Sequence, residues 1–129
     1  LVDKIALFKA EHQAEYHQFL ENSRRCLKAM IAGFQTNNLS AIQDQIRTNR
    51  ILLANLAKRS GVAIDTPLLK QLCQIAEQFG GAAKTSGAGG GDCGIVAIDH
   101  QANLAELTNA WQRAGIERLP LTVHFVAEP

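Results

Sequence analysis

Five of the ten glycines in this 129-residue chain fall between Gly87 and Gly94, and this cluster is the feature that most limits how the chain can fold. Apolar residues recur at helical spacing before the cluster, whereas a short apolar run and a later alternating run follow it. We therefore expect an α+β fold in which helices cover one face of a small, largely antiparallel sheet.

Apolar residues three and four positions apart, together with capping residues and terminating glycines, predict four helices. The predicted helices are Ile5–Phe34, a second from its N-cap Asn38 to Gly61, a third from Thr66-Pro67 to Gly80-Gly81, and a fourth from its N-cap Asp99 to Gly115. Trp111 lies on the apolar stripe of the fourth helix, so we interpret it as a core residue.

Two segments after the glycine cluster have the pattern of strands. Residues 95–98, Ile-Val-Ala-Ile, form a short apolar run typical of a buried strand. Residues 119–126 alternate apolar and other side chains with a period of two. Pro120 cannot donate a hydrogen bond to a neighbouring strand, so this second strand starts there or lies at an edge.

The composition is that of a folded domain, with 47% hydrophobic residues, 19% charged residues and a mean hydropathy of −0.05. The formal net charge of +1 indicates neither a nucleic acid nor a membrane as a partner. Cys26, Cys73 and Cys93 lack the spacing of a metal site and are predicted to be small buried thiols, a pattern that fits a reducing, cytoplasmic location. Arg47 and Arg50 are interpreted as solvated charges of a helix surface, although they could reach an anionic substrate.

Residues Lys84–Gly94 form the one stretch whose composition a packing argument does not explain. Its glycines permit positive φ and carry no Cβ, so several backbone N–H groups can point into one concavity that suits an oxyanion. Thr85 and Ser86 add hydroxyl donors, and Lys84 adds a cation. The alternative interpretation is a flexible turn that joins two strands.

Residues Ala83–Ile95 read Ala-Lys-Thr-Ser-Gly-Ala-Gly-Gly-Gly-Asp-Cys-Gly-Ile and closely resemble the third motif of the GHMP kinases. The order of helices, motif, strand, helix and closing strand also resembles the C-terminal, ferredoxin-like domain of that superfamily. The resemblance implies that residues 1–129 are a C-terminal domain, because the other motifs of the family, which belong to an N-terminal nucleotide-binding half, are absent from this sequence.

The Asp92-Cys93 variant of the motif is most similar to that of bacterial phosphomevalonate kinases. This similarity implies ATP-dependent phosphoryl transfer onto 5-phosphomevalonate in isoprenoid biosynthesis, with ATP and Mg²⁺ as cofactors. The substrate- or phosphate-binding residues that it implies are Lys84, Thr85, Ser86, Gly87, Ala88, Gly89, Gly90, Gly91 and Asp92. Asp92 either faces Mg²⁺ or substrate, or caps N–H groups of the loop.

The partner implied by the resemblance is the N-terminal half of the same enzyme, which is expected to carry the main catalytic groups. The chain by itself is then expected to be inactive, and to self-associate through the apolar surface that this half would cover. Two alternatives remain open: another small-molecule kinase of the superfamily, such as a mevalonate kinase, and a non-enzymatic anion-binding or dimerisation module.

Overall fold

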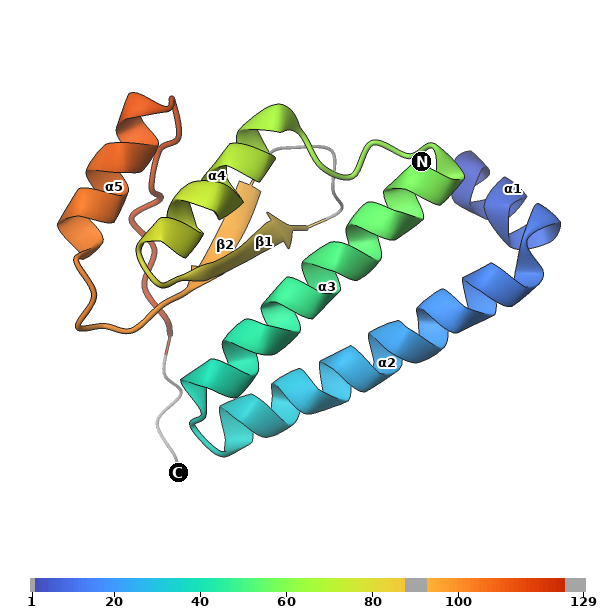
Figure 1. Cartoon of the computed structure of the whole chain (residues 1–129), viewed down its shortest axis with the longest axis horizontal. Coiled ribbons are helices and arrows are strands. Elements are labelled where there is room, and N and C mark those ends of the chain that lie inside the picture. The colour runs from blue at the N-terminus through green and yellow to red at the C-terminus, as the bar shows by residue number, and fades with distance from the viewer. Residues whose placement is uncertain (1, 88–92, 125–129) are drawn as a thin grey trace.

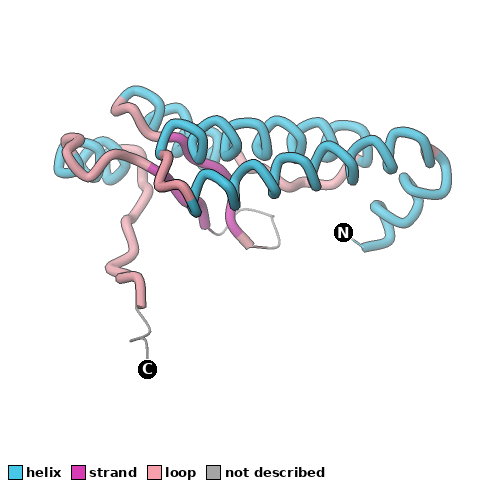
Figure 2. The backbone as a smooth tube through the Cα atoms, turned by 90° about the horizontal axis from the view of Figure 1, so that it is seen from below, coloured by secondary structure: helices cyan, strands magenta, loops and turns pink. Residues whose placement is uncertain are grey.

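The structure is a computed structural model that describes residues 2–87 and 93–124. Its elements in chain order are α1 (Val2–Glu11), α2 (Gln13–Gln35), α3 (Leu39–Ser60), α4 (Pro67–Gln78), β1 (Ala82–Ser86), β2 (Cys93–Ala97) and α5 (Leu104–Arg113). The long helices α2 and α3 form a hairpin, and α3 runs beside the unit made of α4, α5 and the strands (Figure 1). Figure 2 shows the helices side by side, and the described segment after α5 running away from them. The predicted α+β class is confirmed.

The ends of α3 and α4 are those that the sequence predicts. The Asn38 side chain accepts a hydrogen bond from the Ala41 N–H at 3.0 Å, and the Thr66 hydroxyl accepts one from the Leu69 N–H at 3.2 Å. Gly61 ends α3 with φ +77°, a conformation that favours glycine. Asn38 and Gly61 thus set the two ends of α3, and Thr66 sets the start of α4.

The first predicted helix is wrong in one respect, because residues 5–34 do not form a continuous helix. At His12 the backbone has φ −133° and ψ +57°, which ends α1 at Glu11 and starts α2 at Gln13. The change of direction lets Phe8 pack with Leu56, Val62 and Ile64 in a small buried cluster. Burial of Phe8 therefore decides the direction of α1 where periodicity alone predicts a straight helix.

The predicted N-cap of the last helix is also wrong. Asn103 caps α5, since its side chain accepts from the Glu106 N–H at 3.1 Å. Asp99 instead accepts from the Gln101 N–H at 2.8 Å within the preceding turn. Asp99 lies five residues before the first residue of α5, whereas an N-cap directly precedes its helix.

The predicted strand at residues 119–126 does not form over its described part. Residues 119–124 have no strand assignment, and Leu119, Leu121 and Val123 are more than half exposed. Alternating residues form a strand only when a neighbouring strand bonds their backbone, and within the described residues this segment has no such neighbour. Residues 125 and 126 lie outside the described residues.

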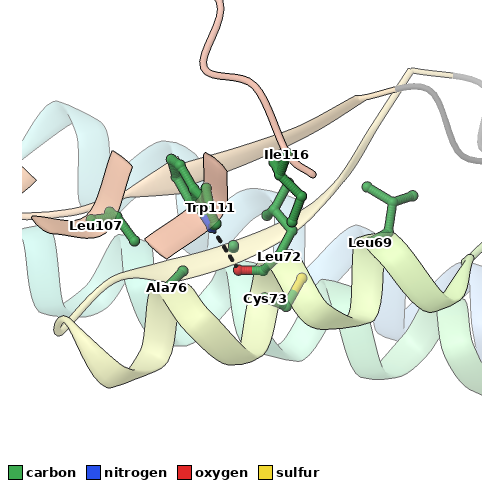
Figure 3. Packing of buried hydrophobic residues seen from close by; sticks show 8 residues of the cluster. Leu69, Leu72, Cys73, Ala76, Leu107, Trp111 and Ile116 are labelled. Carbon is green, nitrogen blue, oxygen red and sulfur yellow. Dashed lines mark hydrogen bonds between the residues drawn. The ribbon is translucent and has the colours of Figure 1, made fainter. Parts of the chain in front are cut away.

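The sheet consists, in the described residues, of β1 and β2 paired antiparallel, with Ala82 opposite Ala97 and Ser86 opposite Cys93. The main core lies between α4, α5 and this sheet. Trp111 of α5 points at α4 and its Nε1 donates to the Leu72 carbonyl at 3.2 Å (Figure 3), which confirms it as a core residue. The buried members of this cluster are Leu69, Leu72, Cys73, Ala76, Ala83, Leu107, Trp111 and Ile116.

Candidate functional site

The glycine-rich segment lies at the tip of the β1–β2 hairpin. β1 ends at Ser86, Gly87 follows with φ +80°, and β2 begins at Cys93. A side chain is strained at such a φ, so the turn out of β1 favours glycine at this position. The predicted site residues Ala88, Gly89, Gly90, Gly91 and Asp92 lie outside the described residues.

Lys84, Thr85 and Ser86 belong to β1, whereas the sequence interpretation places them in a loop. Because successive side chains of a strand point to opposite faces, Lys84 and Ser86 share one face and Thr85 the other. The neighbouring residues fix the two faces. Ala82 packs with Ile42 of α3 and so marks the face of Lys84 and Ser86, while Ala83 joins the core under α4.

Thr85 is therefore separated from the other two predicted ligands. Its side chain lies on the α4 side, is 7% exposed, and its Oγ1 has no hydrogen-bond partner among the described residues. Lys84 and Ser86 remain together on the other face, next to the glycine turn. The structure thus brings together one cation and one hydroxyl of the predicted set.

The Lys84 ammonium is half-buried and donates to the Thr85 carbonyl at 2.7 Å. Burial lowers its pKa from the ordinary value, because removal from water disfavours the charged form. An anion next to Nζ would offset this desolvation. The chemistry at this end of β1 is therefore suited to binding a negatively charged group.

Gly94, the last glycine of the motif, has a packing role. A Cβ at this position would lie 3.0 Å from Leu72 Cδ1 and 3.2 Å from the Lys84 carbonyl oxygen. Glycine here lets α4 lie close to β2, so this part of the motif is explained by the fold and not by a ligand.

Polar side chains of α3 bind the backbone of the hairpin. Arg50 Nη1 donates to the Ala83 carbonyl at 2.9 Å. Gln43 Nε2 donates to the carbonyls of Gly80, at 2.9 Å, and Ala97, at 3.0 Å. The spacing of Gln43, Arg47 and Arg50 places all three on one side of α3, and this spacing is the signal that the sequence interpretation misses.

The interpretation of Arg47 and Arg50 as solvated charges is wrong, because both contact Glu77 of α4. Arg47 Nε donates to Glu77 Oε1 at 2.8 Å, and Arg50 Nη2 lies 3.5 Å from the same oxygen. The Arg47 hydrogen bond, followed by the charges of both arginines, holds the pKa of Glu77 below its ordinary value, and the same bond raises the pKa of Arg47. The three side chains form a network between α3 and α4.

The cysteines divide into two kinds. Cys26 and Cys73 are buried as predicted, and burial raises the pKa of each thiol. Cys93 is exposed, contrary to the prediction, because it stands at the start of β2 opposite Ser86. The described residues contain no group of three or more metal-ligating side chains and no helix long and apolar enough to cross a membrane.

Two hollows lie between helices in the described structure, and neither is lined by Lys84, Thr85 or Ser86. One, of about 270 Å³, lies between α3 and α4 and is lined by Arg50, Cys73 and Glu77 among others. The other, of about 460 Å³, lies along α2 and α3 near α1. Neither coincides with the described part of the predicted site.

Comparison with known proteins identifies the class. Residues 10–117 match the family described as GHMP kinases C terminal, so the chain belongs to this family. It is 39% identical over 111 residues to a protein named phosphomevalonate kinase from Streptomyces sp. (strain CL190), a match that covers 84% of this chain and 30% of the relative. It also resembles the crystal structure of the Lin0012 protein from Listeria innocua, with a TM-score of 0.86 and 42% identity, covering 92% of this chain and 34% of that one. The chain thus spans about a third of the length of the relatives that it matches.

Proposed function

We propose that this chain is the C-terminal domain of a phosphomevalonate kinase, which uses ATP and Mg²⁺ to convert 5-phosphomevalonate to its diphosphate. The observation that carries the proposal is the 39% identity to the Streptomyces phosphomevalonate kinase. The partner is the N-terminal, nucleotide-binding part of the same enzyme, which supplies the main catalytic groups. We place the enzyme in the cytoplasm, as a participant in isoprenoid biosynthesis.

The residues at the hairpin tip have the chemistry that this role needs. Phosphoryl transfer depends on positioning and on neutralising spread negative charge, for which a cation and preorganised donors are suited. Lys84 and Ser86 share a face beside Gly87, and we assign them to the phosphate together with backbone N–H groups of residues 87–91. Thr85 is the weakest member, because its side chain lies on the α4 side. Asp92 keeps its two alternative roles.

The exposed apolar side chains fit a domain that works against another part of the protein. Leu27, Ile31 and Phe34 lie on one side of α2 and are exposed. Surfaces of this kind mark interaction sites more often than isolated exposed leucines do. Self-association of the isolated chain through such surfaces stays a prediction.

A chimera tests the proposal: this chain replaces the matching segment of the Streptomyces kinase. We expect ATP- and Mg²⁺-dependent phosphorylation of 5-phosphomevalonate, with mevalonate as the comparison acceptor, and no turnover by this chain alone. A folded chimera that phosphorylates only mevalonate, or turnover by the isolated chain, would contradict the assignment.

Two variants of the chimera test the site. Ser86→Ala should weaken 5-phosphomevalonate binding by about 1–3 kcal/mol, the range for a hydrogen bond to a charged group. Gly90→Val should weaken binding by placing a side chain where the backbone approaches the ligand. Thermal midpoints should change far less than affinity. Unchanged affinity in both variants would mean that the loop only joins two strands.

A further inference from the structure

Side chains of α3 donate hydrogen bonds to backbone carbonyls of the β1–β2 hairpin. Arg50 Nη1 donates to the carbonyl of Ala83 at 2.9 Å, and Ala83 directly precedes Lys84. The hydrogen bond joins a guanidinium to a neutral carbonyl, and bonds with one charged member are stronger than neutral ones. Arg50 is therefore placed to fix the backbone from which the Lys84 side chain extends.

Glu77 of α4 is the acidic partner of the Arg50 guanidinium. Its Oε1 lies 3.5 Å from Arg50 Nη2 and accepts from Arg47 Nε at 2.8 Å. The Arg50 side chain is 27% exposed, less than that of Arg47 or Glu77. The Arg50 guanidinium thus connects α3, which carries it, with both α4 and β1.

We propose that Arg50 is a positioning residue for the candidate anion site, acting through Ala83 and without contact to the ligand. This inference rests on the proposed function, since it assigns Arg50 to the same site. Precise placement matters because an anion site that uses the Lys84 ammonium and the Ser86 hydroxyl gains affinity only when these groups are already in place. Arg50 supplies that placement at the residue preceding Lys84.

The same helix offers a matched control for a merely stabilising role. Arg59 of α3 bonds Glu15 of α2 through two hydrogen bonds, one of them Nε to Oε2 at 2.7 Å. This pair also joins an arginine of α3 to a glutamate of a neighbouring helix, and it lies at the C-terminal end of α3. Loss of Arg59 therefore removes an arginine–glutamate pair and leaves the backbone of β1 untouched.

The experiment compares Arg50→Met, Arg50→Lys and Arg59→Met in this chain. Thermal midpoints measure stability, hydrogen exchange measures the opening of the β1 amides, and titration with inorganic pyrophosphate, followed at the amides of residues 84–87, measures anion affinity. We expect Arg50→Met to accelerate β1 exchange and to weaken pyrophosphate binding by about tenfold each, the effect of losing one charged hydrogen bond. Arg50→Lys should restore part of both, and Arg59→Met should change neither by more than about twofold.

The outcomes separate this inference from the function on which it rests. If Arg50→Met alters β1 exchange and pyrophosphate affinity no more than Arg59→Met does, the positioning role is wrong. If the unaltered chain does not bind pyrophosphate, the proposed anion site fails, and the exchange comparison still decides whether Arg50 fixes β1. If Arg50→Met does not fold, Glu77→Gln loosens Arg50 without removing it and should give the same pattern more weakly; normal β1 exchange in that variant would overturn the inference.

Discussion

The middle and the C-terminal end of α3 both carry arginine–glutamate ion pairs, but in different surroundings. At its C-terminal end, Arg59 bonds Glu15, and both side chains are about half exposed. In the middle of the helix, Arg47 and Arg50 contact Glu77, with side chains about one third exposed or less, and Arg50 also bonds a strand carbonyl. Exposed pairs contribute little to stability. The third partner, here the backbone of β1, distinguishes the Arg50–Glu77 contact from the Arg59–Glu15 pair.

The hydrophobic clusters at the two ends of the molecule also differ, because the one beside the sheet has more buried members. The cluster of α4, α5 and the sheet has eight buried members, among them Trp111, and lies directly behind the hairpin. The cluster at the other end consists of Phe8, Leu56, Val62 and Ile64 and holds the short helix α1. We call these the sheet end and the helix end of the molecule. The cluster at the sheet end packs against β1, whereas the cluster at the helix end joins α1 to α3 and the segment after it.

The largest test of this difference is Trp111→Ala against Phe8→Ala. Truncation of Trp111 should lower the free energy of unfolding by about 3–5 kcal/mol, because it leaves a cavity in the larger cluster and removes the Nε1 hydrogen bond to the Leu72 carbonyl. Phe8→Ala should have a smaller global effect, because α1 can separate locally without opening the sheet. Urea unfolding with hydrogen exchange measures both. Equal global losses would show that the two clusters unfold as one.

The sequence predicts those parts of the fold that short-range contacts decide. Asn38, Thr66 and Gly61 act on groups within four residues, and all three were predicted correctly. Asp99 is the exception, because it bonds the Gln101 N–H within a turn and Asn103 caps α5 instead. Asp and Asn side chains favour both turns and helix caps, so residue type alone does not decide which of the two is the cap.

The strands depend on partners that are distant in sequence. Residues 82–86, Ala-Ala-Lys-Thr-Ser, have little strand character, yet they form β1 because β2 and side chains of α3 bind their backbone. Residues 119–124 alternate clearly but find no partner within the described structure. The motif predicts Lys84 and Ser86 as ligands, and this stays a prediction. The bond of Arg50 to Ala83 cannot be predicted from local patterns, because it joins residues 33 positions apart.

The next test compares two glycines, one at each end of the molecule. A Cβ at Gly81 would lie 2.8 Å from Val96 Cγ2 and 3.2 Å from the Ala76 carbonyl oxygen, so Gly81→Ala should destabilise the chain by about 1–3 kcal/mol through overpacking. Gly61 has free space but φ +77°, so Gly61→Ala should cost about 1 kcal/mol through backbone strain. Thermal and urea midpoints decide. A milder effect at Gly81 than at Gly61 would show that the sheet end can shift to admit a methyl group.

A smaller effect is expected from the acidic partners. The arginine hydrogen bond lowers the pKa of Glu77, and that of Arg59 lowers the pKa of Glu15. A lowered folded-state pKa gives stability that is present above the ordinary value of 4.5 and is lost as pH falls through the lowered value. Glu77→Gln should therefore reduce stability at neutral pH, by about 0.5–1 kcal/mol after solvent screening. It should also make the free energy of unfolding fall less steeply as pH is lowered.

Glu15→Gln is the matched variant for this test. This variant should also make the free energy of unfolding fall less steeply as pH is lowered, since the Glu15 carboxylate is likewise paired with an arginine. Only Glu77→Gln should also speed hydrogen exchange in β1, because only Glu77 contacts Arg50. Stability measured from about pH 3 to pH 7, with exchange at neutral pH, checks both statements. Equal β1 exchange in the two variants would remove the distinction between the two ion pairs.

The smallest effect concerns Lys84 at alkaline pH. Partial burial lowers the pKa of its ammonium, so between this lowered value and the ordinary value of 10.5 the unfolded chain binds more protons than the folded chain. Stability contributed by this group therefore rises as pH increases through that window. Lys84→Met should remove the rise, while Lys28→Met, at an exposed position of α2, should leave it in place.

Urea midpoints between about pH 8 and pH 10 measure this rise. Bound pyrophosphate sharpens the test, since an anion beside Nζ favours the charged form and should shift the rise to higher pH in the unaltered chain only. A rise that persists unchanged in Lys84→Met would mean that another group is responsible. Lys84 would then be a solvated lysine, and the difference between the sheet end and the helix end of the molecule would be one of packing alone.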